Sequence, residues 1–141
     1  MNLADSIASP AAVLFTPQQV HAARAAALPD QRRMVEVLEE QSGLDSRSFA
    51  QALASTLHYA LLGMDDLHHL TAAFDVLPFA EALERECIAL REDDGHLILV
   101  MSDPFDIRLQ GWAEQRIAFP FDWGLAHRAD VAAYLARHEE T

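Results

Sequence analysis

Apolar residues in the second half of the chain form two short, uninterrupted runs, at residues 87–90 and 97–101. The polar segment between them contains Asp94-Gly95, a dipeptide that tolerates the positive φ of a tight hairpin turn. Because the second run is apolar at every position, we expect a strand that is buried on both faces. The pattern therefore predicts an antiparallel hairpin whose second strand lies inside a sheet.

The residues after the second run predict a direct entry into a helix. Asp103 is a suitable N-cap, Pro104 suits the first helical position, and Asp106 favours the positive end of the helix dipole. We expect this helix at about residues 104–115. An acid–base pair of Asp103 and Asp106 is the alternative, but their positions match those of capping residues.

Residues 118–123 alternate in a period of two, which predicts a third strand. Pro120 indicates an edge strand, because proline lacks an N–H for a second neighbour. The aromatic residues Phe119, Phe121 and Trp123 pack on the sheet or form a partner-binding surface, and the exposed edge is a second possible docking element. A last helix is expected at residues 127–138.

The first half of the chain predicts three short helices. Thr16 begins a capping box, Asp30 is placed to cap the second helix, Gly43 to end it, and Asp45 or Ser46 to start the third. We expect a flexible N-terminus at residues 1–15, a helical lobe at 16–62 and an α+β lobe at 63–141. The fold class is α+β: the helical lobe, then a small three-stranded sheet (hairpin plus strand–helix–strand) packed with helices. Pro78 fits the first turn of the helix before the hairpin.

Charge excludes several classes of function. The net charge is −12 over 141 residues, and all ten basic residues are arginine. Binding to nucleic acid or to an anionic membrane is therefore not expected, and a phosphate loop, which needs lysine, is absent. No run approaches the ~20 apolar residues of a membrane span, and a cytosolic domain without a secretory signal is expected. The N-terminal positive charge resides on four arginines, which either steer an acidic partner or are scattered solvated charges: Arg24, Arg32, Arg33 and Arg47.

The candidate chemistry is sparse. The single Cys87 forms no internal disulfide and suits a small buried hydrophobe. The segment with Asp65, Asp66, His68 and His69 predicts either a solvated turn with surface histidines or a metal site of a small hydrolase. We expect the first alternative, with no metal, no catalytic residues and no enzymatic activity.

Taken in order, these motifs resemble a known family. The helical lobe is followed by Leu77-Pro78, Asp94-Gly95 and Ser102-Asp103-Pro104, then by a helix, a strand and a helix. This order over most of residues 31–139 is similar to the N-terminal domain of type II secretion ATPases (general secretory pathway protein E) and type IV pilus assembly ATPases.

The resemblance implies an adaptor that docks on the cytoplasmic part of an inner-membrane platform protein. It implies a cytoplasmic location, peripheral to the inner membrane, with oligomers formed through a motor domain that this chain does not contain. In some pilus-type relatives the helical lobe binds cyclic di-GMP through arginine-leucine-glycine openings. Here Arg33-Met34-Val35 keeps the arginine and lacks the glycine, so the resemblance implies nucleotide binding by a degenerate motif as an alternative. The same domain attached to another membrane enzyme, such as a glycosyltransferase, is a further alternative.

Overall fold

The computed structural model describes residues 14–139, and the chain divides into two compact units, Met1–Tyr59 and Ala60–Thr141. Most of the predicted flexible segment, residues 1–13, lies outside the described residues. Phe15, its last residue, is buried: its N–H donates to Thr56 Oγ1 at 2.9 Å, and its ring lies 5.7 Å from that of Phe49.

From residue 14 onward, the first unit contains three helices, namely α2 (Pro17–Asp30), α3 (Met34–Ser42) and α4 (Ser46–Leu57). Thr16 closes a capping box with Gln19, and Asp45 caps α4 by accepting from Ser48 N–H. Gly43 ends α3 in the left-handed conformation with φ 69°. The prediction that Asp30 caps α3 is wrong. Asp30 is the last residue of α2, and Arg33 occupies the N-cap of α3 without a side-chain hydrogen bond.

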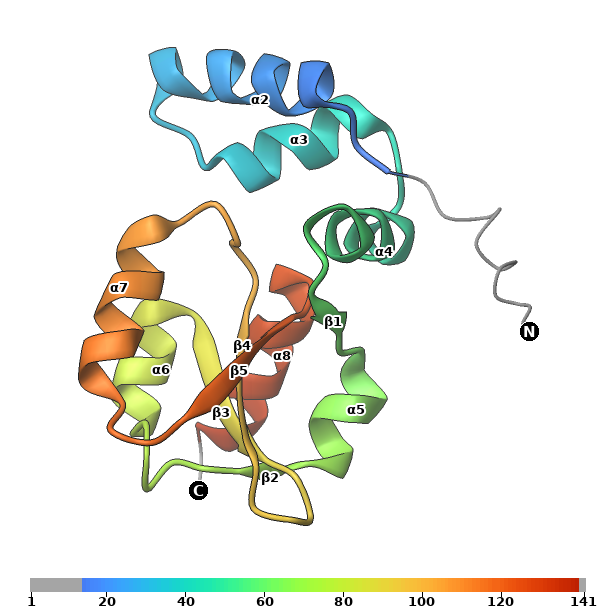
Figure 1. Ribbon diagram of the computed structural model, residues 1–141. Helices are drawn as coiled ribbons and strands as arrows, with labels where there is room; N and C mark the ends of the chain where they lie inside the picture. The colour runs from blue at the N-terminus through green and yellow to red at the C-terminus, as the bar shows by residue number, and fades with distance from the viewer. Residues whose placement is uncertain (1–13, 140–141) are drawn as a thin grey trace. The chain divides into compact units, whose positions relative to one another are not determined.

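The second unit has an open five-stranded sheet in the order β1-β5-β4-β3-β2 (Figure 1). The hairpin strands are β3 (Cys87–Arg91) and β4 (Leu97–Met101), and β5 (Phe121–Leu125) pairs in parallel with β4. Two strands of two residues, β1 (Ala60–Leu61) and β2 (Thr71–Ala72), extend the sheet on either side. The α+β class is confirmed, whereas the predicted number of three strands is too small. Strands as short as β1 and β2 carry no periodic signal.

Four helices complete this unit: α5 (Met64–His69), α6 (Phe79–Arg85), α7 (Ile107–Arg116) and α8 (Arg128–His138). Figure 1 shows α8 passing behind the sheet. Side chains join α6 to α7, because Arg116 binds Glu81 through two hydrogen bonds of 2.8 and 2.7 Å. In the same pair of helices, the Arg85 guanidinium lies 4.5 Å from the centre of the Trp112 ring.

The core of the unit is the central pair of strands. β4 has neighbours on both sides, and Leu97, Leu99, Val100 and Met101 are all buried, as predicted for a strand covered on both faces. Register places Cys87 opposite Met101 and Leu99 beside Trp123, so alternate residues of three strands share each face. Burying one large aliphatic side chain contributes about 1.5–3 kcal/mol to the free energy of unfolding. The buried side chains of β3 and β4 therefore contribute strongly to the stability of the sheet.

The helix after β4 starts later than predicted. Asp106, not Asp103, is the N-cap of α7, and its Oδ1 accepts from Arg108 N–H and Leu109 N–H. Asp103 instead accepts from Phe105 N–H at 3.1 Å, which forms a turn before the helix and leaves Pro104 outside it. Asp103 and Asp106 are both residues that helix N-caps prefer, so the sequence does not distinguish them. Asp106 becomes the N-cap because a turn at Asp103–Phe105 precedes the helix.

The prediction of β5 as an edge strand is only partly correct. β1 pairs with it at Gly124 and Leu125, whereas no described strand pairs with the outer side of its start at Phe121 and Asp122. The strand begins at Phe121, so Pro120 precedes it and does not interrupt its pairing. Pro78 is the N-cap residue of α6, one position before the helix. Gly95 has φ 89°, as the hairpin turn requires, and its N–H donates to Glu92 C=O at 2.8 Å.

We expect Gly124→Ala to destabilise the second unit. An added Cβ would lie 2.7 Å from Leu62 Cδ1 and 3.1 Å from Ile98 Cγ2, so the side chains of Leu62, just after β1, and of Ile98 in β4 would have to move. Overpacking of this kind costs about 1–3 kcal/mol of unfolding free energy, measurable by urea denaturation. The matched control is Gly111→Ala in α7, where the Cβ meets nothing within 4 Å. This control should stabilise the helix by roughly 0.5–1 kcal/mol, and equal effects of the two variants would contradict the packing of β1 on β5.

Candidate functional site

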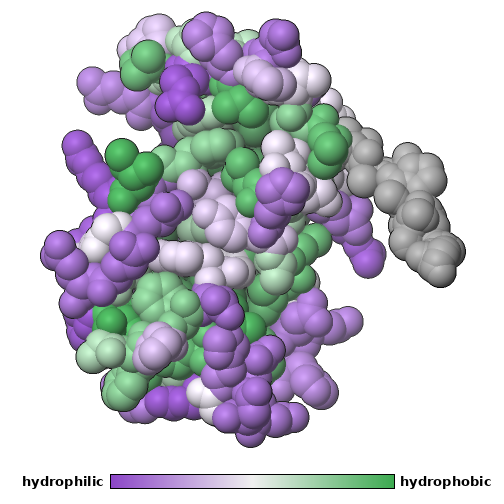
Figure 2. Space-filling view, in the orientation of Figure 1, coloured by the Kyte–Doolittle hydropathy of each residue, from purple (hydrophilic) through white to green (hydrophobic). Residues whose placement is uncertain are grey.

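An open groove of about 470 Å³ lies at the end of the sheet where β4 and β5 begin. The β3–β4 turn forms one side and the residues just before β5 form the other. Figure 2 shows hydrophilic side chains gathered over this turn, at the bottom of the view. We call this the hairpin groove, and its lining residues are Arg91, Asp94, Gly95, His96, Leu97, Phe119 and Pro120.

Both basic side chains of the hairpin groove are paired with carboxylates. Arg91 donates to both oxygens of Asp75, at 2.8 and 2.7 Å, and His96 Nε2 lies 2.7 Å from Asp122 Oδ2. The hydrogen bond from Arg91 lowers the pKa of Asp75 below its ordinary range, and the same bond raises the pKa of Arg91. The two basic side chains that line the groove therefore already have carboxylate partners.

The four arginines predicted as a basic face come from three segments of the helical unit, and all four are exposed. Arg24 lies on α2, Arg32 and Arg33 lie in the connection from α2 to α3, and Arg47 lies in the first turn of α4. Among the contacts described for this unit, none joins the arginines of one segment to those of another. Their shared binding role remains a prediction.

Arg32 acts as a clamp within the unit. Its two terminal nitrogens bind the two oxygens of Glu40 on α3, with Nη1 at 3.0 Å from Oε1. The hydrogen bond with Glu40 raises the pKa of Arg32 further above its already high ordinary value. Both terminal nitrogens of the guanidinium are bound to Glu40. A ligand that bound Arg32 in the same bidentate way would have to displace Glu40.

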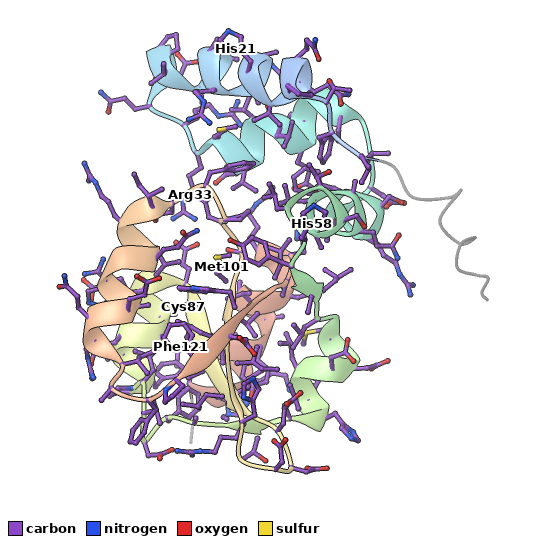
Figure 3. All side chains as sticks on the ribbon, viewed as in Figure 1. His21, Arg33, His58, Cys87, Met101 and Phe121 are labelled. Carbon is purple, nitrogen blue, oxygen red and sulfur yellow. The ribbon has the colours of Figure 1, made fainter. Side chains whose placement is uncertain are left out.

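Arg33 stands directly at the start of α3 (Figure 3). Its backbone is extended, with φ −69° and ψ 131°, and its side chain is exposed. Arg47, in contrast, helps to lower the pKa of Asp45, after the hydrogen bonds from Ser48.

The alternatives with catalytic or metal chemistry find no support in the described part of the chain. Cys87 is fully buried between strands, and burial raises the pKa of its thiol to about 12, so the reactive thiolate does not form near neutral pH. Asp66 accepts from Gly63 N–H at 2.9 Å, and His68 lies against Tyr134 and Arg137. Within residues 14–139 no group of three or more His, Cys, Asp or Glu side chains could hold a metal ion.

Sequence reasoning missed the two ion pairs that shape the groove. His96 and Asp122 are 26 residues apart, and Asp75 and Arg91 are 16 apart. The register of β4 and β5, which pairs Ile98 with Asp122, is what brings His96 to Asp122. Alternation along residues 118–123 was the available signal, but it gives neither the neighbour nor the register of a strand.

Comparison with known proteins places these features in a family. The family model described as the MshEN domain matches residues 57–141, which include the whole sheet. A solved structure, described as that of MshE with cdg, matches with a TM-score of 0.64 and 22% identity, covering 97% of this chain and 98% of that one. At this identity the match shows a shared fold. No curated protein matches the chain.

None of the helices between residues 14 and 139 combines the length and the apolar character that crossing a membrane needs.

We expect Arg91→Ala to lower stability near neutral pH and to have little effect in strong acid. The folded-state pKa of Asp75 is lowered, so the pair's contribution is complete above the ordinary carboxyl pKa of about 3.9 and is lost as the pH falls through the lowered value. Urea denaturation near pH 7 and near pH 2 measures this convergence. Arg108→Ala, which removes an exposed arginine of α7, is the control. A difference between Arg91→Ala and the parent that persists unchanged in acid would show that the pair is not its source.

Proposed function

Because the chain belongs to the MshEN domain family, we propose that it is a noncatalytic interaction domain of a type II secretion or type IV pilus ATPase. Its partner would be the cytoplasmic part of an inner-membrane platform protein. The observation that carries this proposal is the family match over residues 57–141, the region that holds the sheet and the hairpin groove.

The chemistry of the surface supports docking and gives no support to catalysis. The described titratable groups with clear pKa shifts are mainly members of ion pairs, such as Asp75 with Arg91 and Glu81 with Arg116. Ion pairs of this kind fix the local geometry of loops and helices and leave no acid or base poised for proton transfer. A rigid sheet with a mixed polar and aromatic rim is the surface that an adaptor requires.

The first test is a titration of the 141-residue chain with the cytoplasmic part of the cognate platform protein, followed by calorimetry. We expect saturable binding with a Kd in the micromolar range, about −8 kcal/mol, as is common for regulatory contacts. The cytoplasmic part of an unrelated membrane protein is the control. Absence of binding at a platform concentration of ~100 µM would reject the proposed partner.

A second candidate function is binding of cyclic di-GMP, and one observation favours it. The similar structure of MshE is described with cdg, and the match covers almost all of this chain, including the arginines of the helical unit. Arg33 is the residue to test, because it is the arginine of the Arg33-Met34-Val35 segment at the start of α3 and its side chain is exposed.

Calorimetry with cyclic di-GMP tests this candidate. If the nucleotide binds, we expect Arg33→Ala to weaken the affinity by roughly tenfold, because a charge-assisted hydrogen bond to phosphate contributes about 1.5–3 kcal/mol. Arg24→Ala removes the same charge from α2 and should leave the affinity almost unchanged. A flat titration of the parent chain would eliminate nucleotide binding and leave the adaptor proposal standing.

A further inference from the structure

β5 is longer than the strand that covers its outer side. β1 contributes only Ala60 and Leu61, which pair with Gly124 and Leu125. In the described part of the chain no strand pairs with the outer side of residues 121–123. The start of β5, at Phe121 and Asp122, is therefore an open sheet edge, and Trp123 lies at its border with β1.

The backbone of this edge points outward at two positions. Leu62 N–H donates to Leu125 C=O, so residue 125 faces β1, whereas Ala126 N–H donates inward to Met101 C=O. Because the hydrogen-bonding groups of successive residues alternate in direction, those of Trp123 and Phe121 face outward with Leu125. The parallel register of Ala60 with Gly124 directs Ala60 N–H to Trp123 C=O, so the groups that β1 leaves uncovered are the N–H of Trp123 and the N–H and C=O of Phe121. A row of outward N–H and C=O groups is a template for an added strand.

Aromatic side chains accompany the open edge. Phe121 and Trp123 occupy alternate positions of β5 and so share one face of the strand, and Phe119 precedes the strand. We call these three residues the aromatic stripe. The rings of Phe121 and Trp123 meet edge to face with centres 5.3 Å apart, and Phe119 is 58% exposed beside the hairpin groove. Figure 3 marks Phe121 in the lower part of the view, at the start of the strand. Apolar side chains of an added strand would contact these rings.

The charge around the edge selects the occupant. Asp122 projects from the opposite face, between Phe121 and Trp123, and its side chain is 76% exposed although His96 approaches one oxygen. In the neighbouring turn the carboxylate of Asp94 lines the hairpin groove with Phe119, while Arg91 is bound by Asp75. The field at this edge is negative, which favours a basic segment.

A second copy of the chain does not meet this requirement. Its net charge is −12, and a two-fold pairing of the two edges about residue 122 would set one Asp122 opposite the other. Like charges directly opposite each other destabilise a strand pair. The occupant that fits is a segment of a different protein.

We propose that the open edge of β5 binds an extended segment of a partner protein in which apolar and basic residues alternate. Apolar side chains would lie beside Phe121 and Trp123 on the aromatic stripe, and a lysine or arginine would lie beside Asp122 on the other face. Backbone hydrogen bonds supply the affinity and the alternating side chains supply the specificity, as in other cases of strand addition. This inference rests on the proposed docking function and adds the docking element and the chemistry of the partner.

The direct test uses the 141-residue chain and a short synthetic peptide in which valine and lysine alternate. We expect saturable binding in an NMR titration, with the largest shifts and slowed amide exchange at Phe121 and Trp123. A peptide in which valine and glutamate alternate is the control and should not bind. Shifts centred on another element, or no saturable binding, would overturn the inference. Shifts at the edge that depend on protein concentration without peptide would also overturn it, because they would identify a second copy as the occupant.

Two charge-reversal variants distinguish strand addition at β5 from nonspecific electrostatic attraction of a basic peptide. Asp122→Arg should weaken binding of the valine–lysine peptide by roughly tenfold or more, because it sets like charges side by side. Glu114→Arg makes the same change in net charge on exposed α7 and should have a much smaller effect. Equal weakening by both variants would show nonspecific electrostatics and reject the edge as the site.

Binding of the platform protein to the parent chain and to Asp122→Arg tests the docking edge separately from the proposed partner. If the platform protein binds the parent chain and Asp122→Arg equally well, the docking function stands and the edge is rejected. If the peptide binds at the edge while the platform protein does not bind at all, the edge stands and the proposed partner is wrong.

Discussion

The register of β4 between β3 and β5 is the constraint on which the second unit depends. β4 is apolar at every position, so it needs an apolar cover on both faces and a strand on each side. An antiparallel neighbour follows through a turn of five residues, Glu92 to His96, but a parallel neighbour requires a crossover, which α7 provides. A slip of one residue in β5 would move Trp123 to the face of Asp122 and would separate Asp122 from His96. The register therefore fixes the packing of the core, the ion pair at the groove and the face of the aromatic stripe together.

Arginines fasten the segments around this sheet and within the helical unit. Arg91 holds the loop after β2 through Asp75, Arg116 holds α6 to α7 through Glu81, and Arg32 joins the start of α3 to its later turn through Glu40. In each pair the planar guanidinium meets both carboxylate oxygens, a geometry that lysine does not offer. The absence of lysine from the chain is consistent with this use of positive charge. Because Arg32, Arg91 and Arg116 are bound to carboxylates, the number of arginines in the sequence overstates how many are available to a ligand.

The acidic surface and the open edge of β5 both affect which proteins could pair with this strand. A net charge of −12 disfavours association of the chain with itself, and Asp122 places a charge at the open start of β5, where pairing between two copies could begin. The same charge favours a basic segment from another protein. In the docking mode that we propose, the same carboxylate would disfavour pairing between two copies of the chain and favour a basic partner segment.

The sequence alone determined the features that depend on neighbouring residues. The capping box at Thr16, the left-handed stop at Gly43, the hairpin at Gly95 and the apolar central strand all follow from local geometry, and the order of these motifs was enough to indicate the family. Tertiary structure decided what depends on residues far apart. It chose Asp106 over Asp103 as the helix cap, placed β1 beside β5, engaged Arg32 with Glu40 and brought His96 to Asp122. The reason is that periodicity records which side of an element is buried, whereas strand neighbours and ion pairs are set by the packing of segments whose separation in sequence carries no such signal.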